Sequence, residues 1–491
     1  MARASAGTRG RSASIVVLGA GTAGLSAALA LGRDGHRVTL VERDELVVGE
    51  ALDSIDWPRR GIPHFMQPHA FIPRGRKEMR SSFPDVFDAL IAAGSWDLHL
   101  GPKINGPPQD GDEELTYLAA RRPLIEWALR RAVAAEPQVR FVDSTRATGL
   151  VAKKPAIHDP PRVTGIETTA GVLDADLVVD AMGRRTPTPQ WIASVGGRPM
   201  EERSTECGII YYSRYYRVRD GRTLPDGPWI PTPRGDLGYA VFSTFPGDNR
   251  TFAAIIGTPP GDQSLKVARH ASAFEAATET MPALHLWTNP DTAEPITAVL
   301  PMGSLQNTIH SLPDGRPPVI GLVSVADAIC HTDPVIALGL SFSLIHARLL
   351  AAALRDHPTD LSEVALAFDA AARPDMEERF EFASAIDATR ARVWAGESID
   401  FAHADGGAYP YFTYAAGGAA ALVDGDVFRA VVRRNAFLEP LLTLDRDEAM
   451  QRRIEKVFGE VVARGRPRPG PPRDELIAVM DAALAAGGSR G

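Results

Sequence analysis

The sequence of 491 residues predicts an α/β protein, and three of its patterns lead to this prediction. A β-branched apolar run at 15–18 leads at once into closely spaced glycines and an Ala- and Leu-rich stretch, as a buried parallel strand followed by a helix does. Residues 205–260 instead alternate short β-rich runs with Gly, Pro and Asp turns, which is typical of an antiparallel sheet. Beyond about residue 337 the apolar periodicity is mostly helical.

The glycines after the first strand have the spacing G-x-G-x-x-G. Gly19 permits the tight turn, Gly21 lets a pyrophosphate approach the backbone at the helix N-terminus, and Gly24 lets helix and strand pack closely. A second strand at 37–41 ends on Glu42, about 20 residues after the motif, where a carboxylate can bind the ribose of an adenosine. Strand, motif, helix, strand and acid in this order predict a Rossmann-like dinucleotide-binding unit, rather than a glycine-rich turn without a ligand. Its expected contact residues are Gly19, Gly21, Thr22, Ala23, Gly24, Glu42 and Arg43.

Residues 13–31 also form a run of apolar and small residues with arginines in front of it, a pattern that signal peptides and membrane spans share. The glycines at motif spacing and the second strand that ends on Glu42 favour the nucleotide-binding interpretation. No other stretch of the sequence reaches about 18 unbroken apolar residues. We therefore expect no stable membrane insertion and a cytoplasmic location.

Charge and cysteine content narrow the possible partners. The formal net charge is −8 at pH 7 and basic residues are interspersed with acidic ones, which argues against a nucleic-acid partner. The two cysteines, Cys207 and Cys330, lie far apart, which favours a reducing compartment over a structural disulfide. His331 adjoins Cys330, but no His, Cys or carboxylate group has the spacing of a metal site, so we expect no metal.

The sequence divides into four segments. Residues 14–195 form the first part of the dinucleotide-binding domain, and the β-rich residues 196–296 form a separate domain. A buried-strand pattern returns at 319–323, so residues 297–355 are assigned to the second part of the first domain. Residues 356–491 form a helical C-terminal region.

Three local patterns add detail to this division. Residues 43–69 contain several prolines and glycines, which predicts a long ordered loop, and loops of this kind are usually functional. The spacing of apolar residues then predicts one helix over 74–93. Tyrosine pairs at 211–212 and 215–216 alternate along a strand, so one member of each pair should face inward.

Three segments after the glycine motif carry further signals. They are Arg122-x-x-Ile125-x-x-x-Leu129, Asp176-Leu-Val-Val-Asp180-Ala-Met182-Gly183-Arg184, and Val323-Ser-Val-Ala326-Asp327-Ala328…Asp333-Pro334-Val-Ile-Ala337-Leu-Gly339-Leu340-Ser341. In this order they resemble the flavin monooxygenases of the para-hydroxybenzoate-hydroxylase fold, and more narrowly the actinobacterial FAD-dependent hydroxylases and epoxidases of secondary metabolism. The resemblance covers most of residues 14–395. It implies a Rossmann-like FAD-binding domain of the GR2 type, an inserted antiparallel β-sheet substrate domain and a C-terminal helical region.

The resemblance also implies that FAD is the dinucleotide. The family places an FAD-contacting arginine at Arg122, with Arg121 as the alternative in register. It implies that Asp327 bonds the ribityl chain and that the helix from near Gly339 aims its N–H groups at the flavin pyrimidine, where they favour negative charge. Without a ligand, the three segments would be an exposed helical arginine, a strand-end turn and an N-capped helix. The further cofactor-binding candidates are Arg122, Asp180, Gly183, Asp327, Pro334, Gly339 and Leu340.

The sequence departs from the family pattern at Met182, Ala326 and Ala337. Met182 stands where the hydroxylases carry an aspartate that touches FAD and NADPH, and the two alanines replace glycines. A thioether cannot accept strong hydrogen bonds, and no second G-x-G-x-x-G lies between a strand and a helix. We therefore expect electrons to arrive as reduced flavin from a separate flavin reductase, or from NAD(P)H in a slow and poorly specific reaction.

The resemblance implies a FAD-dependent monooxygenase that uses O2. A flavin C4a-(hydro)peroxide would insert one oxygen atom into an apolar organic small molecule, by hydroxylation or epoxidation, in natural-product or antibiotic biosynthesis. Because the flavin carries this chemistry, no acid–base residue is assigned. His64, His69 and His331 lie on segments expected near the flavin and are candidates for catalysis, although histidines in such places more often have a structural hydrogen-bonding role.

Other functions stay open at this point. A flavin-dependent reductase or desaturase of an isoprenoid-type substrate shares the fold and needs no O2. A flavin-dependent halogenase is another alternative. Trp229-Ile-Pro, Gly49-Glu-Ala and Lys77 weakly resemble halogenase motifs, but the tryptophan motif is incomplete. A FAD-binding carrier without turnover is the remaining alternative.

Overall fold

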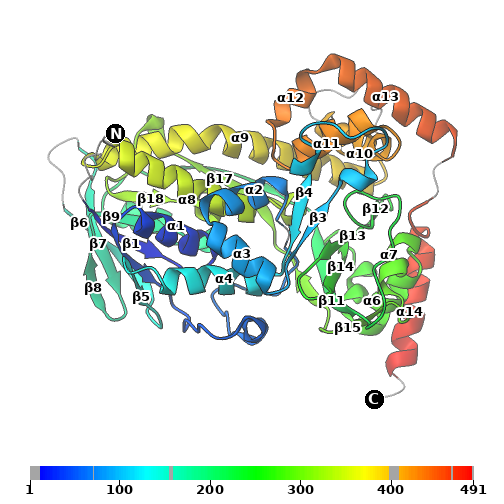
Figure 1. Ribbon diagram of the computed structural model, residues 1–491, viewed down its shortest axis with the longest axis horizontal. Helices are drawn as coiled ribbons and strands as arrows, with labels where there is room; N and C mark the ends of the chain where they lie inside the picture. The colour runs from blue at the N-terminus through cyan, green and yellow to red at the C-terminus, as the bar shows by residue number, and fades with distance from the viewer. Residues whose placement is uncertain (1–11, 70, 154–158, 398–408, 466–467, 489–491) are drawn as a thin grey trace, which may run out of the picture.

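The computed structural model describes residues 12–69, 71–153, 159–397, 409–465 and 468–488. Figure 1 shows an elongated molecule, with the blue-to-yellow sheet and helices at one end and a green antiparallel sheet with its own helices at the other. Orange helices lie above the green antiparallel sheet in this view. The expected α/β class, with a parallel Rossmann-like sheet, separate antiparallel sheets and C-terminal helices, is confirmed.

The parallel sheet has the strand order β18-β9-β1-β2-β5, and each neighbouring pair is parallel. Both faces of β1 are covered, as is usual for parallel sheets. Ile15 and Val17 pack against the helices on one face. Val16 and Leu18 pack on the other face, beneath a small antiparallel sheet. The strands are β1 (Ser14–Leu18), β2 (Arg37–Val41), β5 (Val139–Val142), β9 (Leu177–Asp180) and β18 (Leu322–Ser324).

Helices cover the first face of this sheet, and α1 lies between the other two. These helices are α1 (Thr22–Arg33), α4 (Arg122–Ala134) and α8 (Gly339–Asp356). The second face carries β6 (Ala147–Lys153), β7 (Arg162–Thr168) and β8 (Gly171–Asp174). α5 (Thr188–Ser194) follows β9 in the chain.

The helix that the sequence predicts over 74–93 is interrupted. It consists of α2 (Pro73–Ser82) and α3 (Pro84–Ala92), which are separated by Phe83. A proline disfavours the helical conformation of the residue before it, and Phe83 has φ −137° and ψ 62°. The prediction of one continuous helix is therefore wrong at Pro84.

The antiparallel sheet has the order β12-β13-β14-β11-β15, and β16 also pairs with β11. Tyr212 and Tyr216 face the core beneath α6 (Ala271–Glu279) and α7 (Pro282–Thr288). Tyr211 and Tyr215 lie on the other face, where the hydroxyl of Tyr211 donates to Asp333. Both faces of β11 are thus buried. The strands are β11 (Ile210–Val218), β12 (Arg234–Asp236), β13 (Val241–Pro246), β14 (Thr251–Thr258), β15 (Ala293–Pro295) and β16 (Leu300–Met302).

Smaller sheets and the C-terminal helices complete the structure. β10 (Glu201–Glu206), β17 (Gln306–Ser311) and β19 (Cys330–His331) form one sheet, and β3 (Trp96–His99) pairs with β4 (Thr116–Ala119). α9 (Leu361–Trp394) packs along α8, and α14 (Arg473–Gly488) packs against α6 at the far end (Figure 1). Between them come α10 (Tyr409–Ala421), α11 (Gly425–Asn435), α12 (Leu441–Arg446) and α13 (Glu448–Ala463). Over the described ranges, no helix has the length and apolar character that crossing a membrane requires.

The turn between β1 and α1 gives a test of the fold. A Cβ on Gly24 would lie 1.7 Å from the carbonyl oxygen of Gly19, whereas a Cβ on Gly21 would have no neighbour closer than 3.5 Å. We expect Gly24→Ala to destabilise the protein by about 3 kcal/mol or more, because the added methyl group would clash with the backbone of Gly19 and force it to move. Gly21→Ala is the matched control and should keep the wild-type midpoint of thermal unfolding in the absence of added cofactor. Equal midpoints for all three proteins would contradict this packing.

Candidate cofactor site

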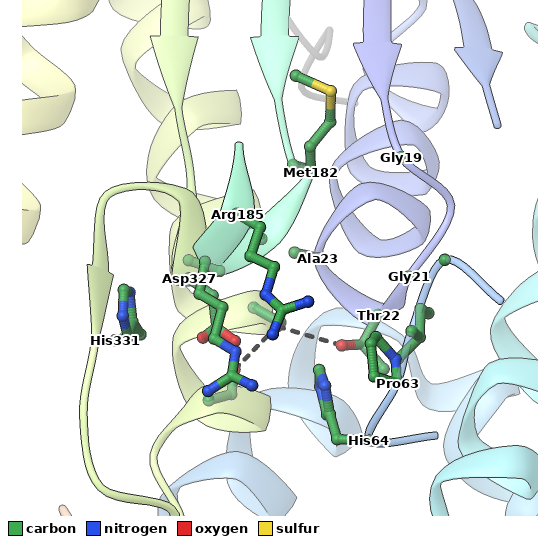
Figure 2. Close-up of a pocket in the computed structure, with 18 of the residues that line it drawn as sticks. Gly19, Gly21, Thr22, Ala23, Pro63, His64, Met182, Arg185, Asp327 and His331 are labelled. Atoms are coloured by element: carbon green, nitrogen blue, oxygen red, sulfur yellow. Dashed lines mark hydrogen bonds between the residues drawn. The ribbon is translucent and has the colours of Figure 1, made fainter. Parts of the chain in front are cut away.

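A cavity of about 570 Å³ lies between the carboxyl ends of β1 and β2 and the loop that precedes α8 (Figure 2). It gathers most of the residues that the sequence singled out from distant parts of the chain. These are Gly19, Gly21, Thr22, Ala23, Glu42, Arg43, His64, His69, Arg122, Gly183, Asp327, His331, Pro334, Gly339 and Leu340. Gly24 and Asp180 lie behind its wall.

The N-terminus of α1 forms one end of the cavity. The first N–H groups of a helix have no partner within the helix, and Gly21, Thr22 and Ala23 all line the cavity. A Cβ on Gly21 would meet only Nη2 of Arg122 and Cδ1 of Ile62, both at 3.5 Å. The backbone is therefore bare on this side, and a helix N-terminus beside a guanidinium is suited to an anion such as a pyrophosphate.

Gly24 and Asp180 support this end from behind. Gly24 has its Cα against Gly19, where no side chain has room. Asp180 is fully buried and accepts hydrogen bonds from the N–H of Met182 at 3.0 Å and from the hydroxyl of Thr186 at 2.8 Å. Burial raises the pKa of Asp180, and these bonds oppose that rise. Asp180 thus holds the turn that carries Gly183 to the cavity and does not face the cavity itself.

Glu42 lies where the sequence predicts it, at the end of β2, but its carboxylate already has protein partners. Oε2 accepts from the N–H of Ala20 at 2.8 Å, and Oε1 accepts from the N–H of Asp44 at 3.0 Å. The buried guanidinium of Arg59 lies 3.3 Å from Oε2 and also pairs with Asp44. Sequence reasoning missed Arg59, because nothing in the Trp-Pro-Arg-Arg run marks which arginine turns inward.

Arg122 lines the cavity, whereas Arg121 is not among the residues that line it. Nε of Arg122 donates to Glu126 at 2.9 Å, and Nη1 lies 3.3 Å from Nε2 of His69. Arg121 instead forms a buried ion pair with Asp248 at 2.6 Å. Arg122 is thus held over the N-terminus of α1 by two neighbours.

The histidines near Arg122 are uncharged at neutral pH. Nδ1 of His69 donates to the carbonyl of Gln67 at 2.7 Å, so that Nε2 can accept from Arg122. Burial and the charge of Arg122 lower the pKa of His69 to about 3. The same two causes lower the pKa of His64 well below its ordinary value. Both are therefore neutral hydrogen-bonding groups in the cavity wall.

The N-terminus of α8 forms the other end of the cavity. Ala326 and Ala337, which replace family glycines, both have positive φ, +52° and +57°. The N–H of Ala326 donates to Nδ1 of the buried His346 at 2.9 Å, which stabilises this uncommon backbone conformation. The resulting turn places Asp327 beside the start of α8, with Oδ1 3.4 Å from the Cβ position of Gly339. His331 lies across from Asp327 in Figure 2.

The cavity wall carries an excess of positive charge. Its carboxylates are Glu42, Asp327 and Asp333, and its arginines, among the described residues, are Arg43, Arg60, Arg122, Arg146, Arg184 and Arg185. Burial and the charge of Arg185 lower the pKa of Arg184. Met182 lines the cavity as well, but its side chain points away from Arg185 and Asp327 (Figure 2). This excess of positive charge suits an anionic ligand.

A buried polar cluster lies behind the loop that leads to α8. Asp333 accepts from the hydroxyl of Tyr211 at 2.6 Å and from Nη2 of Arg390 at 3.0 Å, and the same nitrogen donates to Asp387 at 2.7 Å. Burial and the charge of Asp333 raise the pKa of Asp387 to about 8. Sγ of Cys207 and oxygens of the two aspartates lie within 4.8 Å of one another, a grouping that their spacing in the sequence does not reveal. Arg390 bridges both carboxylates.

The chain resembles known proteins at the level of one segment and of the whole fold. Residues 17–84 match the family model of the NAD(P)-binding Rossmann-like domain. Over 225 residues the chain is 32% identical to Protein Rv3254 of Mycobacterium tuberculosis, and this match covers 42% of the chain. The match spans 45% of the length of that curated relative.

Solved structures share the fold over most of the chain. PqsL of Pseudomonas aeruginosa, a probable FAD-dependent monooxygenase, aligns with a TM-score of 0.56 at 15% identity, over 79% of this chain and 99% of PqsL. The chain has the fold of the FAD-dependent monooxygenases. The flavin-dependent brominase Bmp2 aligns with a TM-score of 0.50 at 16% identity, over 98% of this chain and 100% of Bmp2. The fold is therefore shared by more than one flavin chemistry.

The buried His346, which accepts from the N–H of Ala326, gives a pH-dependent prediction. Burial lowers the pKa of His346 to about 3, so the folded protein leaves it neutral while the unfolded chain protonates it near pH 6.5. Its contribution to stability is present above pH 6.5 and is lost as the pH falls toward 3. Between pH 7 and pH 5 this loss amounts to about 2 kcal/mol.

Urea unfolding at the two pH values measures this effect. His346→Gln does not titrate but keeps a carbonyl near the Ala326 N–H, and we expect its loss of stability to be smaller than that of wild type by about 2 kcal/mol. His270→Gln, at an exposed position, is the control and should behave like wild type. If His346→Gln lost as much stability between pH 7 and pH 5 as wild type does, the role of His346 in this pH dependence would be contradicted.

Proposed function

We propose that the chain is a FAD-dependent monooxygenase. It inserts one oxygen atom from O2 into an apolar organic substrate, by hydroxylation or epoxidation, in natural-product biosynthesis. The observation that carries this proposal is the cavity, which runs from the N-terminus of α1 to the N-terminus of α8 and is lined by an excess of arginines. An extended dinucleotide would place its pyrophosphate at the first helix and its ring system at the second.

The residues present fit FAD at both ends of the cavity. The accessible backbone at Gly21 and the guanidinium of Arg122 suit the pyrophosphate. We propose that Glu42, whose carboxylate also accepts from the N–H groups of Ala20 and Asp44, contacts the adenosine ribose. Asp327, beside Gly339, suits the hydroxyls of the ribityl chain. When bound and reduced, FAD supplies the electrons with which O2 is activated.

The protein's own contribution is to orient the cofactor and to keep water out. Glu126 and His69 fix the direction of Arg122, and the neutral state of His69 leaves that charge available to the ligand. The positive end of α8 favours negative charge that develops on the neighbouring ring. Apolar side chains, including Phe245 and Leu305, line the wall near this end and limit access of water.

The position of Lys77 weakens the halogenase alternative. Lys77 lies on α2 with its side chain 59% exposed and Nζ 2.6 Å from Glu114, away from the residues that line the cavity. Trp229 is buried elsewhere, with Nζ of Lys103 5.9 Å from its ring centre. Halide-dependent turnover would restore that alternative. Turnover without O2 consumption would favour a reductase or desaturase, and no flavin-dependent turnover would favour a carrier.

Cofactor identity is the first test of the proposed function. The purified protein should be yellow, or turn yellow with added FAD, and should release FAD on denaturation. In Gly21→Val the side chain would occupy the place of the pyrophosphate, and FAD affinity should fall about a hundredfold or more. The thermal midpoint of the cofactor-free variant should stay near that of wild type, which shows that the loss is local. Release of NAD in place of FAD on denaturation would contradict the proposal.

The electron donor is tested separately. Because Met182 supplies no carboxylate at the turn before Gly183, we propose that the electrons come from a separate flavin reductase or from slow reduction by NAD(P)H. In anaerobic stopped-flow mixing with NADPH and substrate, the bound flavin should stay oxidised for well over about a second, which is slow against ordinary turnover. A reductase or dithionite should then bleach it, with product forming after O2 is admitted. Bleaching by NADPH within about a second would show direct reduction.

A further inference from the structure

A second, smaller cavity lies next to the end of the first cavity that borders the N-terminus of α8. It has a volume of about 80 Å³, enough for several non-hydrogen atoms when one water needs about 10–15 Å³. The two cavities share Phe245, on β13, and Ala337, in the loop before α8. Val335 and Ile336 of the same loop also line the second cavity. A molecule in the second cavity would therefore touch the loop on which the flavin ring is proposed to rest.

The walls of this second cavity are mostly apolar. Leu98 and Leu118 come from the β3–β4 pair, Phe245 from the antiparallel sheet and Phe382 from α9. Ligand sites for small organic molecules have this character, with a few polar groups that fix orientation. The cavity thus joins three parts of the fold at one place.

The charged groups of the second cavity are of one sign. Among the described residues that line it, Arg234 and Arg379 are charged and none is Asp or Glu. Arg234 is exposed, whereas Arg379 is fully buried on α9. A buried charge is costly unless it is paired, so the partners of Arg379 decide what the cavity can accept.

Arg379 is incompletely paired within the protein. Nη1 and Nη2 donate to the carbonyls of Arg434 and Glu439, at 3.2 and 3.1 Å, which are neutral acceptors. Nε has no hydrogen-bond partner among the described residues, and the nearest ion pair, to Glu378, is 4.0 Å long. Burial lowers the pKa of Arg379 to about 10, with Glu378 and Asp375 opposing the fall.

An amide side chain lies in the same wall. Asn435 is the last residue of α11 and lines the cavity. Its Oδ1 has no hydrogen-bond partner within the part of the chain that the structure describes. Amide oxygen and nitrogen exchange places by a half-turn, so this group can present N–H to an acceptor. A guanidinium and an amide in one apolar cavity are a suitable pair for an acidic oxygen group.

We propose that the second cavity is the substrate subsite, and that it takes an apolar organic acid whose carboxylate is bound by Arg379 and Asn435. The inference rests on the proposed function for the reaction but concerns a different set of residues. The carboxylate would give Arg379 a hydrogen-bonded anionic partner, which Glu378 at 4.0 Å does not, and the apolar body would extend past Phe245 and Ala337 toward the first cavity. Arg379 and Asn435 are specificity-determining residues in this account.

Binding of matched acids and amides tests the proposal. The FAD-loaded protein is titrated with benzoate and 2-naphthoate and with the neutral benzamide and 2-naphthamide, with the flavin absorption spectrum and thermal midpoint as readouts. We expect each acid to bind at least about tenfold more tightly than its amide, the scale of one charged hydrogen bond. Equal affinities, or no binding of any probe, would overturn the proposal.

Variants locate the effect. Arg379→Met should remove the preference for acids, whereas Arg433→Met, an ion-paired arginine outside the cavity, should keep it. Because Arg379→Met could fail to fold, Ala119→Phe is a second variant that fills the cavity without removing a charge. It should abolish acid binding, and unchanged acid binding in Ala119→Phe would also overturn the proposal.

Failure of the proposed function gives a different result. If the protein binds no FAD, the flavin spectrum is absent, but the thermal midpoint of the cofactor-free protein still reports acid binding. An acid-specific shift without FAD would then retain the subsite and reject the monooxygenase. FAD binding without any preference for acids would retain the monooxygenase proposal and reject the subsite.

Discussion

The close approach of backbone at the β1–α1 turn is the constraint on which the site depends. A side chain at Gly24 would run into Gly19, and one at Gly19 would lie 2.8 Å from the carbonyl oxygen of Ala181. Because both positions lack a Cβ, the start of α1 lies directly against the end of β1 and the turn after β9. The free N–H groups of α1 and the turn that carries Gly183 then border the same cavity.

Buried charge networks hold the remaining parts of the cavity in place. Arg59 lies between Glu42, Asp44 and Glu126, and Glu126 also pairs with Arg122. The part of the cavity wall at Glu42 and the part at Arg122 are thus connected through buried ion pairs. Such networks are costly to break, because removal of one partner leaves a buried charge unpaired.

The parts of the fold that local patterns specify could be predicted from the sequence. The strand at 15–18, the glycine motif and the strand that ends on Glu42 lie as predicted, because their periodicity and turn chemistry are local. The prediction of one continuous helix over 74–93 is wrong, because Pro84 interrupts the helix although the apolar residues keep helical spacing. Met182 keeps its place in the turn, but only the structure shows that its side chain points away from Asp327.

Contacts between distant segments account for what sequence reasoning missed. The predicted contact of Asp180 with the cofactor stays a prediction, and its carboxylate accepts hydrogen bonds from the N–H of Met182 and the hydroxyl of Thr186. Arg59, His346 and Arg379 carry no local motif, and their roles follow from burial beside groups remote in the sequence. The second cavity likewise needs β4, β13 and α9 to meet, which no single segment indicates.

A crystal structure of the protein with bound FAD tests the central claim most directly. The account predicts the pyrophosphate against the backbone of residues 21–23 and Arg122, and the isoalloxazine ring against the loop at 334–339. The edge of the ring should face the second cavity across Phe245 and Ala337. Electron density for a nicotinamide dinucleotide in this cavity, or for FAD with its ring away from the N-terminus of α8, would contradict the account.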